Sequence, residues 1–320
     1  MRTAATDDRP RYAVAVRALL AIAVVLAGST ARADKATLAA LAPARDARRA
    51  VAIGPAGEVY APDGKGAWVR TQAGGVAEEL VTATAVGSTV IAGAKGAPPF
   101  KLKNGAWTAL NVGLKAKAVL GAGSRVVALV GKSVFALDKG PPKKLADAPP
   151  TVNAVVAVGA SPAGVVIATD QGLMKLDKGA FTPIKKAPKG VRGLLSDRWA
   201  VVDHGIVDLK TMKVIAWPAG VHVVETTTLG NDVIGVSQQG KVVELITINA
   251  GKPKAPIVRE PVPIDNAKPV VGVVADKTAR VAIAMRDGRI ALREKGTWTV
   301  IEVREEIAAA KPGPAPAESK

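Results

Sequence analysis

The chain has 320 residues, of which 48% are hydrophobic and 3% aromatic, and its formal net charge is +17. It contains no cysteine, which excludes disulfides, thiolate metal sites, cysteine nucleophiles and an N-terminal lipoprotein anchor. Only two histidines are present, so a histidine metal cluster or a catalytic triad has little support. The abundance of Val, Ala and Gly favours tightly packed strands joined by tight turns over a disordered chain.

The N-terminal segment has the layout of a secretory signal. Arg9, Arg11 and Arg17 precede an apolar run over 18–27, and Thr30-Ala31-Arg32-Ala33 fits the small-x-small cleavage rule. The run is well short of the roughly 20 residues that span a bilayer, which argues against a transmembrane anchor. We therefore predict that residues 1–33 are removed on export, that the mature protein begins at Asp34, and that no transmembrane segment remains. It would be periplasmic or secreted. The mature chain would keep 39 basic and 25 acidic residues, a net charge of +14.

Residues 34–46 follow the predicted cleavage point and contain Leu38, Leu41 and several alanines. They suit either a short leader helix or an extra strand that closes a ring by pairing with the last repeat.

A glycine followed at the second position by an aromatic residue recurs along the chain, often at a spacing of 39 residues. The four copies are Gly66-Ala67-Trp68, Gly105-Ala106-Trp107, Gly179-Ala180-Phe181 and Gly296-Thr297-Trp298. Gly140 marks a fifth, because Leu137-Asp138-Lys139-Gly140 is repeated as Leu176-Asp177-Lys178-Gly179. A repeat of this length in a strand-rich sequence predicts a β-propeller. The regularly spaced aromatic side chains are expected to pack between blades.

The clearest repeat predicts four strands, over 152–158, 165–169, 173–177 and 180–184. The apolar signature of the second strand recurs seven times, at 59–61, 90–92, 127–129, 166–168, 199–201, 233–235 and 281–283. We therefore predict one all-β domain over 47–305, a single β-propeller of seven four-stranded blades. Six blades are the alternative if residues 222–280 form one long irregular blade.

The C-terminal segment 306–320 contains Pro312, Pro314 and Pro316 and shows no apolar periodicity, which predicts a disordered tail. Elsewhere the familiar cofactor motifs fail. Gly131-Lys132-Ser133 ends like a phosphate-binding loop, but Val126 stands where the leading glycine is required. No stretch has calcium-loop spacing. We expect no cofactor and no metal site.

The turns between second and third strands of a propeller share one face, and in this chain they are polar. Together with Lys189, in a loop that enters a first strand, they form the candidate binding face. The turn residues are Asp63, Lys95, Lys132, Asp170, Gln171, Asp203, His204, Gln238, Gln239, Arg286 and Asp287. The alternative interpretation is that Asp, Gln and Gly occur there because they form good turns.

Two segments carry a family resemblance. Residues 170–182, with Gly172-Leu173 opening one strand and Gly179-Ala180-Phe181-Thr182 the next, resemble the repeat of bacterial extracytoplasmic sensor propellers. Residues 286–299 look like a second good copy. The resemblance implies the propeller fold and a role in binding a ligand or partner, although no effector domain accompanies the repeats.

Two classes of function follow from this reading. The first is a non-catalytic binding or scaffolding protein of the cell envelope, expected to be a monomer. Its partner would be a protein or an anionic polysaccharide, because the mature chain is basic; export argues against nucleic acid. The second is a propeller lyase or hydrolase. It would need His204 or His222 and two acidic groups within about 4 Å of a common pocket at the ring axis.

Overall fold

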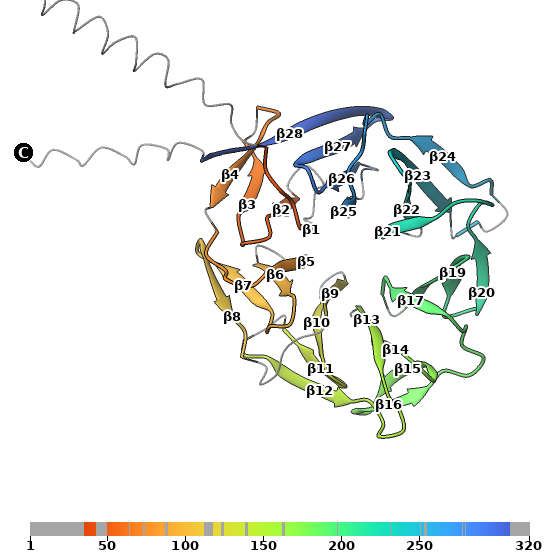
Figure 1. Cartoon of the computed structure of the whole chain (residues 1–320). Coiled ribbons are helices and arrows are strands. Elements are labelled where there is room, and N and C mark those ends of the chain that lie inside the picture. The colour runs from red at the N-terminus through yellow and green to blue at the C-terminus, as the bar shows by residue number, and fades with distance from the viewer. Residues whose placement is uncertain are drawn as a thin grey trace, which may run out of the picture. The chain divides into compact units, whose positions relative to one another are not determined.

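A computed structural model describes residues 35–307 apart from 43–49, 64, 73, 87–88, 112–117, 123–124, 138–139, 162–163, 197, 231, 250, 253–254, 277 and 279. The chain divides into two units, 1–34 and 35–320, and every described residue belongs to the second. The predicted signal peptide and the tail beyond 307 lie outside the described residues. Figure 1 shows the strands of the second unit gathered into sheets around a centre.

Five sheets have four antiparallel strands each, and in each of them every strand pairs with the strand that follows it in the chain. The first two are β5(Leu80–Val86), β6(Thr89–Ala94), β7(Phe100–Lys103), β8(Ala106–Ala109) and β9(Ala118–Ala122), β10(Arg125–Val130), β11(Ser133–Ala136), β12(Lys143–Asp147). The next two are β13(Val155–Ser161), β14(Gly164–Thr169), β15(Gly172–Asp177), β16(Ala180–Pro183) and β17(Val191–Leu194), β18(Trp199–Val202), β19(Gly205–Asp208), β20(Lys213–Ala216). The fifth is β21(Val223–Leu229), β22(Asp232–Gln239), β23(Val242–Asn249), β24(Val258–Pro261).

The sixth sheet has eight strands and joins the two ends of the domain. It contains β1(Ala40–Ala42), β2(Val51–Ile53), β3(Val59–Pro62), β4(Trp68–Gln72), β25(Val270–Ala275), β26(Val281–Met285), β27(Arg289–Glu294) and β28(Thr297–Ile307). Strand β28 has 11 residues, and it pairs antiparallel with β27 and parallel with β4. That parallel pairing merges a run of four N-terminal strands with a run of four C-terminal strands.

The all-β single propeller is confirmed, but the expected set of seven four-stranded blades, or six, is wrong. The part of the chain that the structure describes forms five four-stranded blades and the eight-stranded sheet. The physical reason is the length of β28. Its last residues run beside β4, where unpaired backbone groups on an edge strand are available to a partner strand.

Side chains at the sheet junction reinforce this closure. Tyr60 on β3 donates a hydrogen bond to Glu305 Oε1 at 2.7 Å, and Arg70 on β4 pairs with Glu305 Oε2 at 2.8 Å. Burial, and then the hydrogen bond to the Glu305 carboxylate, raises the pKa of the Tyr60 hydroxyl. Beneath them, Trp68 packs in the same buried cluster as Val303.

The leader segment supplies the first strand of the eight-stranded sheet. Strand β1 pairs with β2, and Leu38 donates its amide to the Arg286 carbonyl at 3.0 Å. As a consequence, the signature at 59–61 lies on the third strand of its run, β3. The other six signatures lie on second strands, namely β6, β10, β14, β18, β22 and β26.

The repeated glycine forms the turn between third and fourth strands. Lys178 and Gly179 have φ of 46° and 86°, and Lys295 and Gly296 have φ of 48° and 82°. Two successive residues with positive φ are typical of a type I′ hairpin turn, whose second position favours glycine. The aromatic residue that follows belongs to a buried cluster with residues of the preceding sheet: Phe181 shares a cluster with Leu129 of β10, and Trp298 packs against a cluster that contains Leu245 of β23. The expected packing role of these aromatics is therefore confirmed.

No helix among the described residues is long and apolar enough to cross a membrane.

Candidate functional site

Antiparallel connections divide the turns of the domain between two ends. The turns between second and third strands and the loops entering each first strand lie at one end, which we call the loop face. The turns between third and fourth strands lie at the other end, the hairpin face. Lys189 lies in the loop between β16 and β17, and every other candidate residue except Asp63 lies in a second-to-third turn or at the strand end beside it. Asp63 lies between β3 and β4, on the hairpin face, because its signature marks a third strand.

Asp170 and Gln171 hold the loop that enters their own sheet. The Asp170 carboxylate accepts hydrogen bonds from the amides of Asn153 and Ala154 at 3.1 and 3.2 Å. Gln171 donates its side-chain amide to the Thr151 carbonyl. The bond from the Ala154 amide is the main cause that holds the pKa of Asp170 below its usual range. These two side chains therefore fix the path of the chain into β13.

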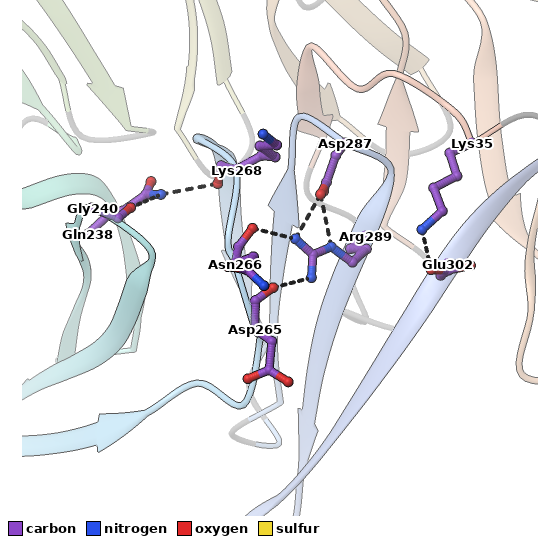
Figure 2. A network of polar contacts seen from close by, with 9 residues as sticks. All are labelled: Lys35, Gln238, Gly240, Asp265, Asn266, Lys268, Asp287, Arg289 and Glu302. Atoms are coloured by element: carbon purple, nitrogen blue, oxygen red, sulfur yellow. Dashed lines mark hydrogen bonds and ion pairs between the residues drawn. The ribbon is translucent and has the colours of Figure 1, made fainter.

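The Gln238 side chain bridges to the adjoining sheet (Figure 2). Its Nε2 donates to the Lys268 and Gly240 carbonyls at 3.1 and 3.2 Å. Its Oε1 accepts a hydrogen bond from the Val270 amide at 3.0 Å. Gln239 donates to the Gly220 carbonyl in the loop entering β21. Both glutamines thus bond the backbone of entering loops.

Asp287 acts on the same loop through an arginine, as Figure 2 shows. Its Oδ2 accepts hydrogen bonds from Arg289 Nε at 3.0 Å and Nη2 at 2.7 Å. Arg289 in turn donates to the carbonyls of Asp265 at 2.7 Å and Asn266 at 3.1 Å. Five of the predicted candidates, Asp170, Gln171, Gln238, Gln239 and Asp287, therefore have a structural role that is visible in their contacts.

The remaining candidates divide into exposed ion pairs and side chains open to solvent. Asp203 pairs with Arg192 on β17, and Lys95 lies 3.8 Å from Glu79. The side chains of Lys132, Lys189, His204 and Arg286 are exposed and have no polar partner among the residues that the structure describes.

Lys189 also borders a recess on the loop face. The recess has a volume of about 520 Å³ and lies between the turn at Asp170–Gly172 and the loop at Pro183–Val191. Lys186 and Lys189 line it, and both are exposed. The hydrogen bonds of Asp170 and Gln171 hold the turn that forms one wall of this recess, and Lys186 and Lys189 belong to the loop that forms the other wall.

A second cavity lies among the first strands β13, β17 and β21, which Figure 1 places nearest the centre of the ring. Its volume is about 540 Å³, and its lining includes Val156, Arg192, His222, Val224 and Glu225. Burial raises the pKa of the Glu225 carboxyl to about 7. The enzyme hypothesis requires two acidic groups beside a histidine, whereas the described lining of this cavity holds one, Glu225.

Sequence reasoning did not single out Glu225 or Arg192. Arg192 is the extra residue of a β-bulge in β17, and Glu225 directly follows Val224, the extra residue of a bulge in β21. The position of a bulge depends on strand pairing, which the alternation of apolar and polar residues does not reveal. Among the residues that the structure describes, no group of three His, Asp or Glu side chains is arranged to hold a metal ion.

No family model matches the chain, and no curated protein matches it in sequence. Similarity appears in three dimensions. YCF48 from Cyanidioschyzon merolae aligns with a TM-score of 0.55 and 12% identity, over 81% of this chain and 95% of that one. The WD40 β-propeller domain of Doa1 aligns with a TM-score of 0.58 and 12% identity, over 82% and 95%.

PorZ, a surface component of the type-IX secretion system of Porphyromonas gingivalis, aligns with a TM-score of 0.57 and 13% identity. The alignment covers 87% of this chain and 39% of PorZ, so this chain corresponds to part of that protein. At identities this low the likenesses concern the fold alone. They agree with the ring of sheets: the chain has the β-propeller fold.

Proposed function

We propose that this protein is a non-catalytic β-propeller scaffold of the bacterial cell envelope that docks an acidic protein surface on its loop face. The observation that carries the proposal is that some polar side chains of the loop face bond neighbouring loops, while others are exposed cations. Asp170, Gln171, Gln238 and Gln239 tie loops to turns, whereas Lys132, Lys189 and Arg286 extend into solvent. A face that is braced by such bonds and also presents unpaired cations is suited to complementary charge on a partner.

The charge of the mature chain supports the same direction. With residues 1–33 removed the net charge is +14, which favours encounter with an anionic partner. The recess beside Lys186 and Lys189 offers a concave place for an acidic side chain of that partner. The likeness to part of PorZ is a likeness in fold and leaves the partner to be found by experiment.

Export is the second part of the proposal. It rests on the short apolar run and the Thr30-Ala31-Arg32-Ala33 sequence. N-terminal sequencing of the protein from its native host is expected to begin at Asp34. Recovery of the intact N-terminus from the cytoplasm would contradict the envelope location.

The docking face is tested with two matched triple variants of the mature protein. The first carries Lys132→Glu, Lys189→Glu and Arg286→Glu on the loop face. The control carries Lys65→Glu, Lys178→Glu and Lys295→Glu, three exposed cations in hairpin-face turns. Both change the net charge equally.

Each variant is immobilised and used to capture proteins from an envelope extract at low and high salt. Exposed charge pairs contribute roughly 0.2–1 kcal/mol each, so three reversals should weaken capture about tenfold or more at low salt. High salt should reduce parent binding as well, because the screening length is about 8 Å at physiological salt. Equal capture by the two triple variants would contradict docking on the loop face. Retention of acidic polysaccharide in place of protein would identify the other class of partner.

A further inference from the structure

The first strands of several sheets share an irregularity in their pairing with the second strands. Pairing between first and second strands shifts by one residue in β5, β13, β17, β21 and β25. The extra residues at these bulges are Val81, Val156, Arg192, Val224 and Val271. A β-bulge re-aims the side chain of its extra residue, and bulges are frequent beside binding sites.

Three of these bulge residues meet at one place. Val156, Arg192 and Val224 all line the cavity of about 540 Å³ among β13, β17 and β21. Val156 is 51% exposed and Val224 is 40% exposed, so two branched apolar side chains stand open to the cavity rather than to the core. Leu194 and Val201 add further apolar lining. The volume lies within the range of roughly 300–1,000 Å³ that is usual for small-molecule sites.

The polar groups of the cavity carry an unbalanced charge. Arg192 is paired with Asp203, and that pair is neutral. His222 is exposed and directly precedes β21. Glu225 has no hydrogen-bond or ion-pair partner among the residues that the structure describes, while its carboxyl oxygens are not sealed from solvent. Among the described residues, Arg192, His222 and Glu225 are the charged or titratable side chains of the lining. An ionised Glu225 would therefore be a lone negative charge beside an apolar wall.

We propose that this axial cavity binds an organic ammonium ion, with the ammonium group on the Glu225 carboxylate and the apolar part against Val156 and Val224. A carboxylate that lacks a partner gains most from a cation, since charge-assisted hydrogen bonds are the stronger ones. An apolar body suits the valine walls.

Binding of such a cation is coupled to proton release. Burial raises the pKa of Glu225 to about 7, so part of the population is protonated at neutral pH. A bound ammonium ion stabilises the ionised form and lowers that pKa. Affinity for an amine should therefore fall as pH drops from 8 to 5. Arg192, Asp203 and His222 are the other charged or titratable groups near the cavity.

The test is calorimetric titration of the mature protein with hexylamine, 1-hexanol and hexanoate, which share an apolar chain and differ in charge. At pH 8, hexylamine is expected to bind at least tenfold more tightly than 1-hexanol or hexanoate. Its affinity at pH 5 is expected to be lower than its affinity at pH 8. At pH 7, two buffers with different ionisation enthalpies should reveal release of a fraction of a proton.

Glu225→Gln is expected to weaken hexylamine binding at least tenfold and to leave hexanol binding unchanged. Glu78→Gln, on an exposed loop, is the matched control and should bind hexylamine as the parent does. The proposal is overturned if hexanoate binds as tightly as hexylamine, if Glu225→Gln leaves hexylamine binding intact, or if the parent shows no pH dependence. The loop-face triple variant should retain hexylamine binding, so this test and the docking test can fail separately.

Discussion

Replacing Glu225 with glutamine should make the protein more stable at high pH and leave its stability unchanged at low pH. Glu225 lies on β21, and burial raises its pKa from 4.5 to about 7. The unfolded chain therefore loses the Glu225 proton at a lower pH than the folded one. Glu225 therefore costs no stability below the pKa that its carboxyl has in the unfolded chain. The protein loses stability as pH rises from that value toward the pKa of Glu225 in the folded protein. Glutamine has nearly the same shape and does not ionise, so it removes this loss.

The size of the effect follows from the shift in pKa. One unit corresponds to about 1.36 kcal/mol, so the shift predicts a gain approaching 3 kcal/mol between pH 4.5 and 7. This value is an upper limit, because the side chain is only partly buried and some solvent reaches it. Above pH 7 the difference between variant and parent should level off.

The assay is urea unfolding of parent and Glu225→Gln at half-unit steps from pH 4 to 8.5, with Glu78→Gln in parallel. The difference in free energy of unfolding for Glu225→Gln should rise through the pH 4.5–7 window, while that for Glu78→Gln should stay level. A flat difference for Glu225→Gln, or one that rises only above pH 8, would refute the reasoning about desolvation at β21.

Three further predictions concern the framework. In urea unfolding, Gly288→Ala should destabilise the protein by roughly 1 kcal/mol or more beyond Gly179→Ala. Both glycines have positive φ, but of the two only Gly288 has a backbone oxygen, that of Ala36, where an added Cβ would clash. Equal losses of stability in the two variants would contradict this. Trp298→Phe should cost about 1–3 kcal/mol, because it removes the hydrogen bond of 2.6 Å from the Trp298 indole to the Glu260 carboxylate and leaves Arg293 as its remaining donor. The double-mutant cycle with Glu260→Gln should show coupling. Asp170→Ala should speed hydrogen exchange at the Asn153 and Ala154 amides while distant strands keep their protection. In the parent, the contribution of the Asp170 carboxylate to stability is present above the ordinary aspartate pKa and is lost as pH falls through the lowered pKa of the folded state.

The sequence predicted the repeat well because its strongest letters have a local cause. Lys178-Gly179 and Lys295-Gly296 require positive φ in a hairpin turn, and the following Phe181 and Trp298 contact the preceding sheet. Such short-range requirements recur once per repeat, which makes them visible as a period.

The spacing of the repeats could not predict the number of separate sheets. It depends on the last residues of β28 pairing with β4, a contact between chain ends far apart in sequence. The leader was equally ambiguous, since three residues of β1 carry too little pattern to distinguish a strand from a helix. One misassigned repeat then moved Asp63 to the wrong face.

The candidate residues other than Asp63 lie at one end of the sheets because of the order of their strands, yet the sequence could not separate the structural ones from the exposed ones. Gln238 and Lys132 are both polar residues next to glycine-containing turns, so the sequence assigns them the same role. Their roles differ because Gln238 meets the Lys268 carbonyl and the Val270 amide of a distant loop. The axial carboxyl Glu225 was missed because a β-bulge is decided by strand pairing rather than by composition.

The most direct test of docking on the loop face is site-specific photocrosslinking. A photoreactive phenylalanine replaces Lys189 on the loop face in one sample and Lys178 on the hairpin face in another; both positions are exposed. Each mature protein is irradiated in an envelope extract of the native host, and covalent adducts are identified by mass spectrometry. The account predicts a discrete protein adduct at position 189, weakened by high salt, and none at position 178. An adduct at position 178 alone, or the same adduct at both positions, would contradict it.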